Sequence, residues 1–429
     1  MVVLILGSGG REHALAWKIA QSNKLTKLFV GPGNAGTSQV AENVALDAGN
    51  FEEIASFCVE NGVDVLIPGS EAPLVDGIVD YFQGHSELNH IYVFGPNKAC
   101  AELEGSKEFA KVFMQDAGIP TAAYRSFGPD TIEDAYDFLS ELKPPYVLKA
   151  DGLAAGKGVV ILEDIDEAKS TLKDMLLDEK FGEAGARVVI EEFLDGIEFS
   201  VFAITDGEHY ALLPEAKDYK RIGEGDTGLN TGGMGAVSPV PFVDDDLMAK
   251  VRSRIVEPTF HELKRRDLQY VGFVFFGLIA VNGEPYVIEY NCRMGDPETE
   301  VVIPRLSSDL LELVGLSRNN RLNEATIQFD PRSCTTVFAV SGGYPGSYPK
   351  GKNMNIPRSQ DVMYFHAGTK TDGDQIVTSG GRVIAASAFG ASMTEALDRS
   401  YVGVDAVQFE GKYFRTDIGR DLMASNGNS

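Results

Sequence analysis

The N-terminal part of the chain alternates short apolar runs with glycine loops and helical segments, and this alternation most constrains the fold. Residues 2–6 (VVLIL) predict a strand, and the glycine loop 7–10 leads into a helix. The same order returns at 28–36 and 63–71, where apolar runs end in glycine loops. Strands that alternate with helices form a parallel sheet, with ligand-binding loops at the strand carboxyl ends. We therefore predict an N-terminal parallel α/β domain.

The middle of the chain predicts antiparallel strands instead. Apolar runs flank the glycine loop at 152–158, so strand, loop and strand should form a hairpin. The longest apolar run, 271–281, predicts a core strand that Asn282–Gly283 turns into its neighbour. The last part carries further strands and a helix. The sequence thus predicts an α/β and α+β multidomain chain, with domains at 1–102, 103–325 and 326–425.

Composition and charge exclude several classes of function. The net charge of −25 argues against a broad nucleic-acid surface but permits a small cationic pocket. No apolar run approaches the ~20 residues that span a bilayer. Residues 1–6 lack a basic leader, so we expect neither a membrane span nor a secretion signal. The four cysteines are scattered without metal-binding spacing, which predicts reduced thiols and a cytoplasmic location.

Residues 288–300 crowd acidic, amide and basic side chains directly after an apolar run. Because strand side chains alternate between faces, we expect Val287, Glu289 and Asn291 on one face. A carboxylate beside a carboxamide offers hard oxygen ligands of the kind that Mg²⁺ takes. Arg293 follows within reach and suits a bidentate grip on a carboxylate or phosphate. A polar strand end explains the acid and amide alone, but the whole stretch favours a metal–nucleotide site.

Two glycine loops resemble nucleotide fingerprints but depart from them. The loop 7–10 starts like a dinucleotide fingerprint, yet Glu12 stands where a third glycine belongs, which disfavours NAD and a dehydrogenase. A phosphate-binding loop and a tight structural turn remain equally open there. The loop 152–158 is one residue short of a P-loop and lacks its Mg²⁺-binding Ser or Thr. In a hairpin it suits a lid over a triphosphate, with Lys149 and Lys157 neutralising phosphate charge.

Two further segments fit a nucleotide or carboxylate ligand. Residues 228–235 contain four glycines and lie downstream of the charged run 217–221. A solvated turn explains the charges but not the glycines. Residues 191–194 end an apolar strand, and their backbone groups suit an adenine edge, while Glu198 suits ribose hydroxyls.

Together these motifs resemble the ATP-grasp ligases and, among them, the phosphoribosylamine–glycine ligases. The stretches that carry the resemblance are 9–15, 32–36, 71–75, 103–107, 149–158, 230–235, 291–298, 342–346, 366–369 and 380–383. The resemblance implies an N-terminal α/β domain, an ATP-grasp core whose small lid covers about 121–191, and a C-terminal mixed α/β domain. It also implies a monomer.

The resemblance implies an ATP-dependent ligase of de novo purine biosynthesis. The glycine carboxylate attacks the γ-phosphate of ATP, and the amine of 5-phosphoribosylamine then displaces phosphate from the glycyl phosphate. The products are glycinamide ribonucleotide, ADP and phosphate. Two anions approach each other, so cations must screen them, and a lid must keep water from the acyl phosphate. The implied cofactors are ATP and Mg²⁺, with Mn²⁺ left open, and the implied partners are small molecules, with neither nucleic acid nor membrane.

The resemblance also assigns roles to residues. The expected catalytic residues are Arg293 and Asp218. The expected ATP contacts are Lys107, Lys149, Lys157, Glu191, Glu192, Phe193, Leu194, Glu198, Arg221 and Asn230. The expected substrate contacts are Gly9, Gly10, Glu12, Asn34, Glu71, Lys217, Gly233 and Asp296. The expected metal ligands are Glu289 and Asn291.

The chain departs from the family pattern at a few positions. Many relatives have Gln-Asp-His where this chain has Lys217-Asp218-Tyr219, and Met294 and Ser70 replace a common Phe and Pro. The extra cation at Lys217 leaves the glycine contacts open. The alternatives are another ATP-grasp ligase, such as a carboxylase or a formate-using enzyme, and a non-catalytic nucleotide-binding protein. The intact set of acid, amide and arginine at 289–293 argues against mere binding.

Overall fold

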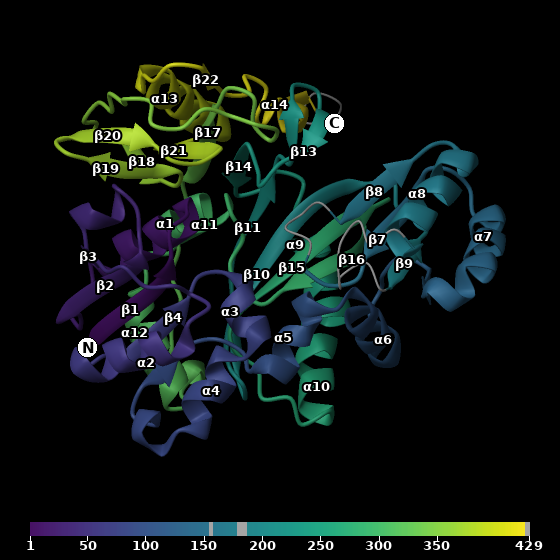
Figure 1. The fold of residues 1–429 in the computed structure, drawn as a ribbon, viewed down its shortest axis with the longest axis horizontal. Helices are drawn as coiled ribbons and strands as arrows, with labels where there is room; N and C mark the ends of the chain where they lie inside the picture. Colours follow the sequence, from purple (N-terminus) through teal and green to yellow (C-terminus); the bar gives the residue numbers. More distant parts are fainter. Residues whose placement is uncertain (154–157, 178–186, 425–429) are drawn as a thin grey trace.

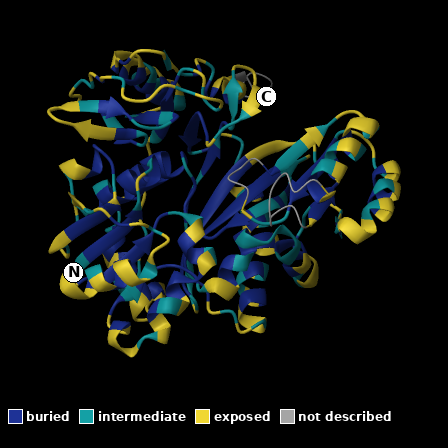
Figure 2. Cartoon of the chain, viewed as in Figure 1, coloured by how far each residue is buried: buried dark blue, intermediate teal, exposed yellow. Residues whose placement is uncertain are grey.

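The computed structural model describes residues 1–153, 158–177 and 187–424. Figure 1 shows the N-terminal sheet, a C-terminal domain above it, and a lid that projects to one side of the large sheet. The strands are mostly buried, whereas the outer helices expose one face (Figure 2). Within the described residues, no helix is long and apolar enough to cross a membrane.

The N-terminal sheet is parallel and runs in the order β3-β2-β1-β4-β5. Its strands are β1 Val2–Gly7, β2 Lys27–Pro32, β3 Glu42–Asn43, β4 Val65–Pro68 and β5 Tyr92–Val93. Its helices are α1 Gly10–Ile19, α2 Phe51–Glu60, α3 Glu71–Asp76 and α4 Ile78–Gly84. The parallel sheet predicted from the alternation is confirmed. The loops after β1, β2 and β4 follow neighbouring strands and therefore meet at one edge.

The lid is an antiparallel sheet in the order β6-β9-β7-β8, with its own apolar core. Helices α5 Lys98–Gly105 and α6 Lys107–Ala117 lead into it. Its elements are β6 Tyr124–Phe127, α7 Ile132–Glu141, β7 Tyr146–Ala150, β8 Val159–Leu162, α8 Ile165–Leu177 and β9 Val188–Glu191. The predicted strand–loop–strand hairpin is β7 and β8. Because the lid has a separate core, it packs as a unit beside the body.

One large sheet joins the ATP-grasp core to the C-terminal domain, in the order β16-β15-β10-β11-β14-β17-β21-β18. The core strands are β10 Ile197–Asp206, β11 Tyr210–Asp218, β12 Arg221–Gly223, β13 Thr227–Asn230, β14 Gly235–Ser238, β15 Val271–Val281 and β16 Glu284–Asn291. The C-terminal strands are β17 Ser333–Ser341, β18 Val362–His366, β19 Thr369–Asp372, β20 Gln375–Thr378, β21 Arg382–Gly390 and β22 Lys412–Tyr413. The helices are α9 Asp245–Val251, α10 Glu257–Arg265, α11 Thr299–Arg305, α12 Leu310–Arg318, α13 Met393–Ala406 and α14 Arg420–Ala424.

A bulge in β16 corrects one sequence expectation. The register against β15 shifts between residues 287 and 289, so Ile288 is an extra residue in the strand. Val287 and Tyr290 both lie in the buried core, which leaves Glu289 and Asn291 together on the other face. The prediction that Val287 shares their face was wrong, because the bulge interrupts the strict alternation. The pairing of the acid with the amide survives.

Candidate functional site

The predicted metal ligands stand at the end of β16 with their side-chain oxygens unused. Glu289 is half-buried and Asn291 is buried, and neither side chain makes a hydrogen bond or ion pair within the described residues. Glu289 interacts electrostatically with Lys107, Lys220 and Asp218. Mg²⁺ commonly takes only one or two protein oxygens and completes its shell with water and substrate phosphates. The acid and the amide therefore fit a divalent cation.

Two predicted phosphate contacts lie next to the described start of the glycine loop. Lys107 begins α6, and its Nζ donates to the carbonyl of Gly152 at 2.9 Å. Burial lowers the pKa of Lys107, and nearby Glu289 acts in the opposite direction. Lys149 is buried on β7. The third predicted cation, Lys157, lies outside the described residues.

Glu191, at the end of β9, has one satisfied and one unsatisfied carboxylate oxygen. Its Oε2 lies 2.9 Å from Nζ of Lys149 and 3.2 Å from Nζ of Lys111. Its Oε1 is buried and has no hydrogen-bond partner in the described part of the chain. A buried acceptor without a donor is costly, so this oxygen suits the donor group of a ligand.

The linker after β9 offers apolar surface beside that oxygen. Phe193 is exposed, and Leu194 is half-buried. Glu192 is used differently, because its Oε1 accepts the backbone N–H of Ala123 at 2.8 Å and ties the two ends of the lid together. Glu198 is the second residue of β10. Its ion pair with Lys220, which follows β11, lowers its pKa.

An acidic group faces Lys220 at the end of β11. The ammonium lies 2.8 Å from Glu198. Burial lowers the pKa of Lys220, but Glu198, Asp218 and Glu289 outweigh it and raise the value. Burial also raises the pKa of Asp218, and Lys220 opposes this shift. Burial and Asp218 raise the pKa of Glu298 to about 8, so the site can hold a proton near neutral pH.

Asp218 ends β11, and the residues on either side of it, Lys217 and Tyr219, turn the other way. Strand side chains alternate, so Lys217 and Tyr219 share the face opposite Asp218. Nζ of Lys217 lies 3.3 Å from Asp421 and 3.8 Å from the Tyr219 ring centroid. The Tyr219 hydroxyl donates to Asp421 at 2.6 Å. The two residues that depart from the family pattern therefore contact one carboxylate of α14.

Arg293 bridges the N-terminal domain and the ATP-grasp core. Its Nη2 lies 2.7 Å from Glu104, and its Nε donates to Glu71 at 3.1 Å. Glu104 also accepts the backbone N–H of Cys292 at 2.7 Å. Burial lowers the pKa of Arg293, but the two carboxylates raise it overall. Burial raises the pKa of Glu71, but Arg293, Arg11 and hydrogen bonds together outweigh it and lower the pKa, so that acid stays ionised.

Glu12 explains the glycines of two N-terminal loops. It is buried, its Oε1 pairs with Arg11 at 2.7 Å, and its Oε2 accepts the N–H of Gly9 at 2.6 Å. A Cβ atom at Gly7, Gly9 or Gly69 would overlap the Glu12 side chain. The acid that breaks the dinucleotide fingerprint therefore occupies the space that these glycines leave.

Asn34 uses all of its hydrogen-bonding groups within the protein. Its Nδ2 donates to the carbonyls of Ser8 and His366 at 2.9 and 2.7 Å. Its Oδ1 accepts the backbone N–H groups of Gly36 and Thr37 at 2.8 and 3.0 Å. Asn34 thus joins the loops after β1 and β2 to the C-terminal domain. It holds the backbone of these loops, which carry expected substrate contacts; we call this part of the predicted site the ribosyl side.

The remaining predicted residues lie where the C-terminal domain meets the core. Asp296 pairs with Arg382 at 2.8 Å. Gly233 has a φ of 116°, and a Cβ there would overlap Pro297, so only glycine fits. Gly10 opens α1 and packs against Glu300.

Arg221 and Asn230 face each other across the hairpin β12–β13. The guanidinium of Arg221 donates to the carbonyl of Gly228 at 2.8 Å, within the same hairpin. Both side chains are half-buried. Their position therefore depends on where the hairpin as a whole is held.

Three family models match nearly the whole chain. They describe the domains of phosphoribosylglycinamide synthetase. The N domain matches residues 1–104, the ATP-grasp (A) domain matches 105–299, and the C domain matches 334–421. Phosphoribosylamine–glycine ligase from Vibrio cholerae is 44% identical over 430 residues and covers 99% of each chain. The chain belongs to the phosphoribosylamine–glycine ligase family. The corresponding ligase of Pseudomonas aeruginosa is 45% identical over the same span.

Solved structures agree with this family. The crystal structure of phosphoribosylamine–glycine ligase from Thermotoga maritima is 33% identical, covers 97% of this chain and 100% of its own, and has a TM-score of 0.85. Biotin carboxylase from Campylobacter jejuni, at 16% identity and a TM-score of 0.72, shares the fold alone. The predicted fold class is confirmed. The chain is an ATP-grasp ligase, a type of enzyme that uses ATP with a divalent metal.

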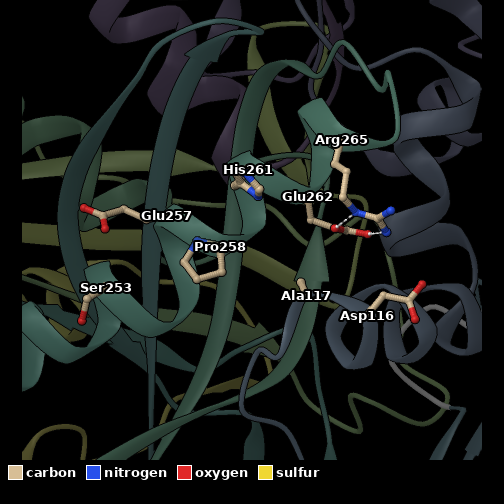
Figure 3. Close-up of a pocket in the computed structure, with 8 residues that line it drawn as sticks. All are labelled: Asp116, Ala117, Ser253, Glu257, Pro258, His261, Glu262 and Arg265. Carbon is tan, nitrogen blue, oxygen red and sulfur yellow. Dashed lines mark hydrogen bonds and ion pairs between the residues drawn. The ribbon is translucent and has the colours of Figure 1, made fainter.

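A surface hollow of this phosphoribosylamine–glycine ligase family member lies apart from the predicted site. It has a volume of about 430 Å³ and is lined by Asp116, Ala117, Ser253, Glu257, Pro258, His261, Glu262 and Arg265. Figure 3 shows Glu262 and Arg265 pointing toward each other, and the two side chains are hydrogen-bonded at 2.6 and 2.7 Å. None of the residues predicted from the family motifs lines this hollow, so its shape alone carries no functional assignment.

Two residues that the sequence did not single out, Lys111 and Glu104, contact predicted site residues of this ligase family member. Lys111 contacts Glu191, and its Nζ donates to Thr121 at 2.8 Å, so it touches both ends of the lid. Burial lowers its pKa to about 8. Its position four residues after Lys107 on α6 was a usable signal, because such residues share a helix face. Glu104 belongs to a family motif, but only the fold brings it to Arg293.

Proposed function

We propose that this protein ligates glycine to 5-phospho-D-ribosylamine, with conversion of ATP to ADP and phosphate, to give glycinamide ribonucleotide. This is the second step of de novo purine biosynthesis, and it passes through a glycyl phosphate. Family membership along nearly the whole chain carries the proposal. The side-chain oxygens of Glu191, Glu289 and Asn291 that have no partner in the described chain support it, because ATP would bring a hydrogen-bond donor and a metal would take oxygen ligands.

The nucleotide occupies the junction of lid and core in this proposal. The adenine ring lies against Phe193 and Leu194, and its amino group donates to the unsatisfied Oε1 of Glu191. Glu192 contributes backbone groups to the adenine edge, and Glu198 accepts from the ribose. Arg221 and Asn230 of the hairpin approach the nucleotide from the opposite side.

The phosphates take the cations around the glycine loop. Lys107, Lys149 and Lys157 are the proposed phosphate contacts, and Glu289 with Asn291 would hold Mg²⁺ or Mn²⁺. The bound metal screens the charge of the triphosphate and helps to orient the γ-phosphate. Lowered pKa values at Lys107 do not abolish its charge once phosphates replace water around it.

The two chemical steps divide between Arg293 and Asp218. A glycine carboxylate oxygen bonds to the γ-phosphorus while the bond to ADP breaks, and Arg293 orients the transferred group and stabilises its developing charge. The amine nitrogen then bonds to the glycyl carbon while the carbon–oxygen bond to phosphate breaks. The nitrogen loses a proton in this step, and Asp218, whose pKa burial raises, suits its acceptance.

The second substrate occupies the edge of the N-terminal sheet. Gly10 opens α1, and its backbone N–H favours the phosphate of 5-phosphoribosylamine, while Gly9, whose own N–H is held by Glu12, lets the loop approach this phosphate. Glu12, Asn34 and Glu71 fix the shape of this pocket through the contacts described above. Lys217, Gly233 and Asp296 complete the proposed substrate side.

The coarser features of the protein complete the proposal. We infer domains at 1–102, 103–325 and 326–425, a monomer, and activity in the cytoplasm. The four cysteines are buried and none forms a disulfide, which suits a reducing compartment.

The decisive experiment is ADP release from Mg²⁺-ATP. Glycine is supplied with and without 5-phosphoribosylamine, which is generated in the cuvette from phosphoribosyl pyrophosphate and ammonia. Release that requires both substrates supports the proposal. Release with bicarbonate or formate in place of glycine would retain ATP-grasp chemistry and reject the glycine assignment. The absence of release with any of these carboxylates would reject the ligase.

A further inference from the structure

The hairpin β12–β13 is held by a segment near the end of the chain. The hairpin forms its own two-stranded sheet within the described residues, separate from the large sheet. Leu229 on it is 67% exposed. A lone two-stranded hairpin is marginally stable in water, so its position must come from other contacts. Figure 1 shows β13 beside α14, and residues 413–421 supply those contacts.

Arg415 is the centre of this contact. It is 1% exposed. Its Nε and Nη2 each donate to Asp417 at 2.8 Å, while its Nη1 donates to Asp226 at 2.7 Å and to the carbonyl of Arg221 at 3.0 Å. The planar guanidinium thus holds its own segment with one edge, and with the other it holds the first residue of β12 and the turn before β13.

Residues next to Arg415 also form hydrogen bonds with the hairpin. The backbone N–H of Gly225 donates to Asp417 at 2.7 Å, and the Tyr413 hydroxyl donates to the carbonyl of Ile222 at 3.0 Å. Thr416 donates to Glu224 through its hydroxyl. The contacts of Lys217 and Tyr219 with α14 extend this attachment to the strand before the hairpin.

We propose that Arg415 is a positioning residue that places the hairpin, and with it Arg221 and Asn230, against the nucleotide. The inference rests on the proposed function for the identity of the ligand, but the placement of the hairpin does not. Among the described residues, Arg415 contacts none of the predicted phosphate and metal ligands, so its effect on ATP passes through the hairpin.

The test compares Arg415→Gln with Arg305→Gln. Arg305 is a matched control, because it is also buried and hydrogen-bonded, to Ser238 at 2.7 Å, but does not contact the hairpin. Both variants should lower the melting temperature. Only Arg415→Gln should raise the KM for ATP, by on the order of 10-fold to 100-fold, as a misplaced binding group does. Arg415→Lys should fall between wild type and Arg415→Gln, because a lysine cannot hold both edges.

Hydrogen exchange of the amides at 221–230, measured without nucleotide, separates the two hypotheses. Faster exchange in Arg415→Gln than in Arg305→Gln supports the positioning role even if the wild type fails to act on glycine. Equal exchange and equal KM values in the two variants would overturn it.

Asp226→Asn keeps the proposal testable if Arg415→Gln fails to fold. Asp226 is exposed on the hairpin, with 54% of its side chain accessible, so its replacement should leave the fold intact. By itself it should raise the KM for ATP; where Arg415→Gln folds, the rise should be smaller than in that variant and should add little in the double variant, because both changes remove the same contact. Full additivity, or an unchanged KM in Asp226→Asn, would contradict the proposal.

Discussion

Three residues of the predicted nucleotide side have side-chain oxygens without a hydrogen-bond partner in the described chain, whereas two residues of the predicted ribosyl side use theirs within the protein. Glu289 and Asn291 make no side-chain hydrogen bond with the described residues, and Glu191 buries one oxygen without a donor. On the ribosyl side, Asn34 makes hydrogen bonds with all its polar groups, and both oxygens of Glu12 have partners. The first group of side chains is therefore available to a ligand, and the second group holds the protein around it in shape.

This difference separates two effects of substitution. Removing an unused group should change ligand binding and turnover with little change in stability, because no internal contact is lost. Removing an engaged group should lower stability first, because it leaves buried partners unsatisfied. Arg293 lies where the two sides meet, so it should show both effects.

The largest expected effect is that of Arg293→Lys. We expect kcat to fall on the order of 100-fold while ATP affinity is retained, because a lysine cannot orient the transferred group as a planar fork does. Steady-state kinetics and ATP titration provide the measurement. The matched control is Arg266→Lys, which also bridges two carboxylates, Asp116 at 2.7 Å and Glu262 at 2.6 Å, on the far side of the core. A parallel loss of ATP affinity in Arg293→Lys would make that residue a nucleotide ligand instead.

Glu289→Gln should have the next largest effect. We expect the apparent affinity for Mg²⁺ to fall about 10-fold to 100-fold, because a charged ligand becomes neutral. The melting temperature should change little, since this carboxylate makes no hydrogen bond or ion pair with the described residues. Activity is titrated with Mg²⁺ at fixed ATP. The control is Glu284→Gln on the same strand, whose carboxylate pairs with Lys250. An unchanged titration in Glu289→Gln would remove that residue from the metal site.

Asn34→Ala should mark the ribosyl side by its stability. We expect the free energy of unfolding to fall by about 1–3 kcal/mol, because buried backbone groups lose their partner. The KM for 5-phosphoribosylamine should rise and the KM for ATP should not. Denaturant unfolding and kinetics test both. Asn50→Ala, which removes a helix cap, should cost about 1 kcal/mol without any change of KM. If Asn34→Ala were as stable as wild type, the comparison between the two sides would fail.

The smallest expected effect is the pH dependence of Glu298→Gln. The pKa of Glu298 is raised from 4.5 to about 8 in the folded protein, chiefly by burial and then by Asp218, with Lys220 and Arg293 opposing. A raised carboxyl pKa stabilises the fold below about pH 4.5, and this contribution is lost as the pH rises through 8. Relative to wild type, the neutral glutamine should therefore become more stable between pH 5 and 8.5. Parallel unfolding curves across this range would contradict the shift.

Local pattern was enough to predict much of the fold. The residues 271–281 were predicted as a core strand, and β15 has those bounds. The parallel N-terminal sheet and the β7–β8 hairpin follow from apolar runs and glycine loops, because periodicity and turn residues act within a few positions. The bulge at Ile288 could not be predicted in this way, since it depends on the register with β15.

The site divides along the same line. The positions of Glu289, Asn291 and Arg293 were fixed by one continuous motif, and their roles stay predictions. Lys111 beside Glu191 joins residues far apart in sequence, and so does the ion pair of Lys217 with Asp421. No local pattern predicts such contacts, because the same lysine could equally face solvent.

The sequence by itself determined the order of strands and helices, the family, and which side chains carry the chemistry. Only the tertiary structure decided which of those side chains remain available to a ligand. Asn34 and Glu289 look alike as motif residues, yet one is engaged by His366 and the other is not engaged within the described chain. Availability depends on what else packs nearby, and packing brings together residues that the sequence keeps hundreds of positions apart.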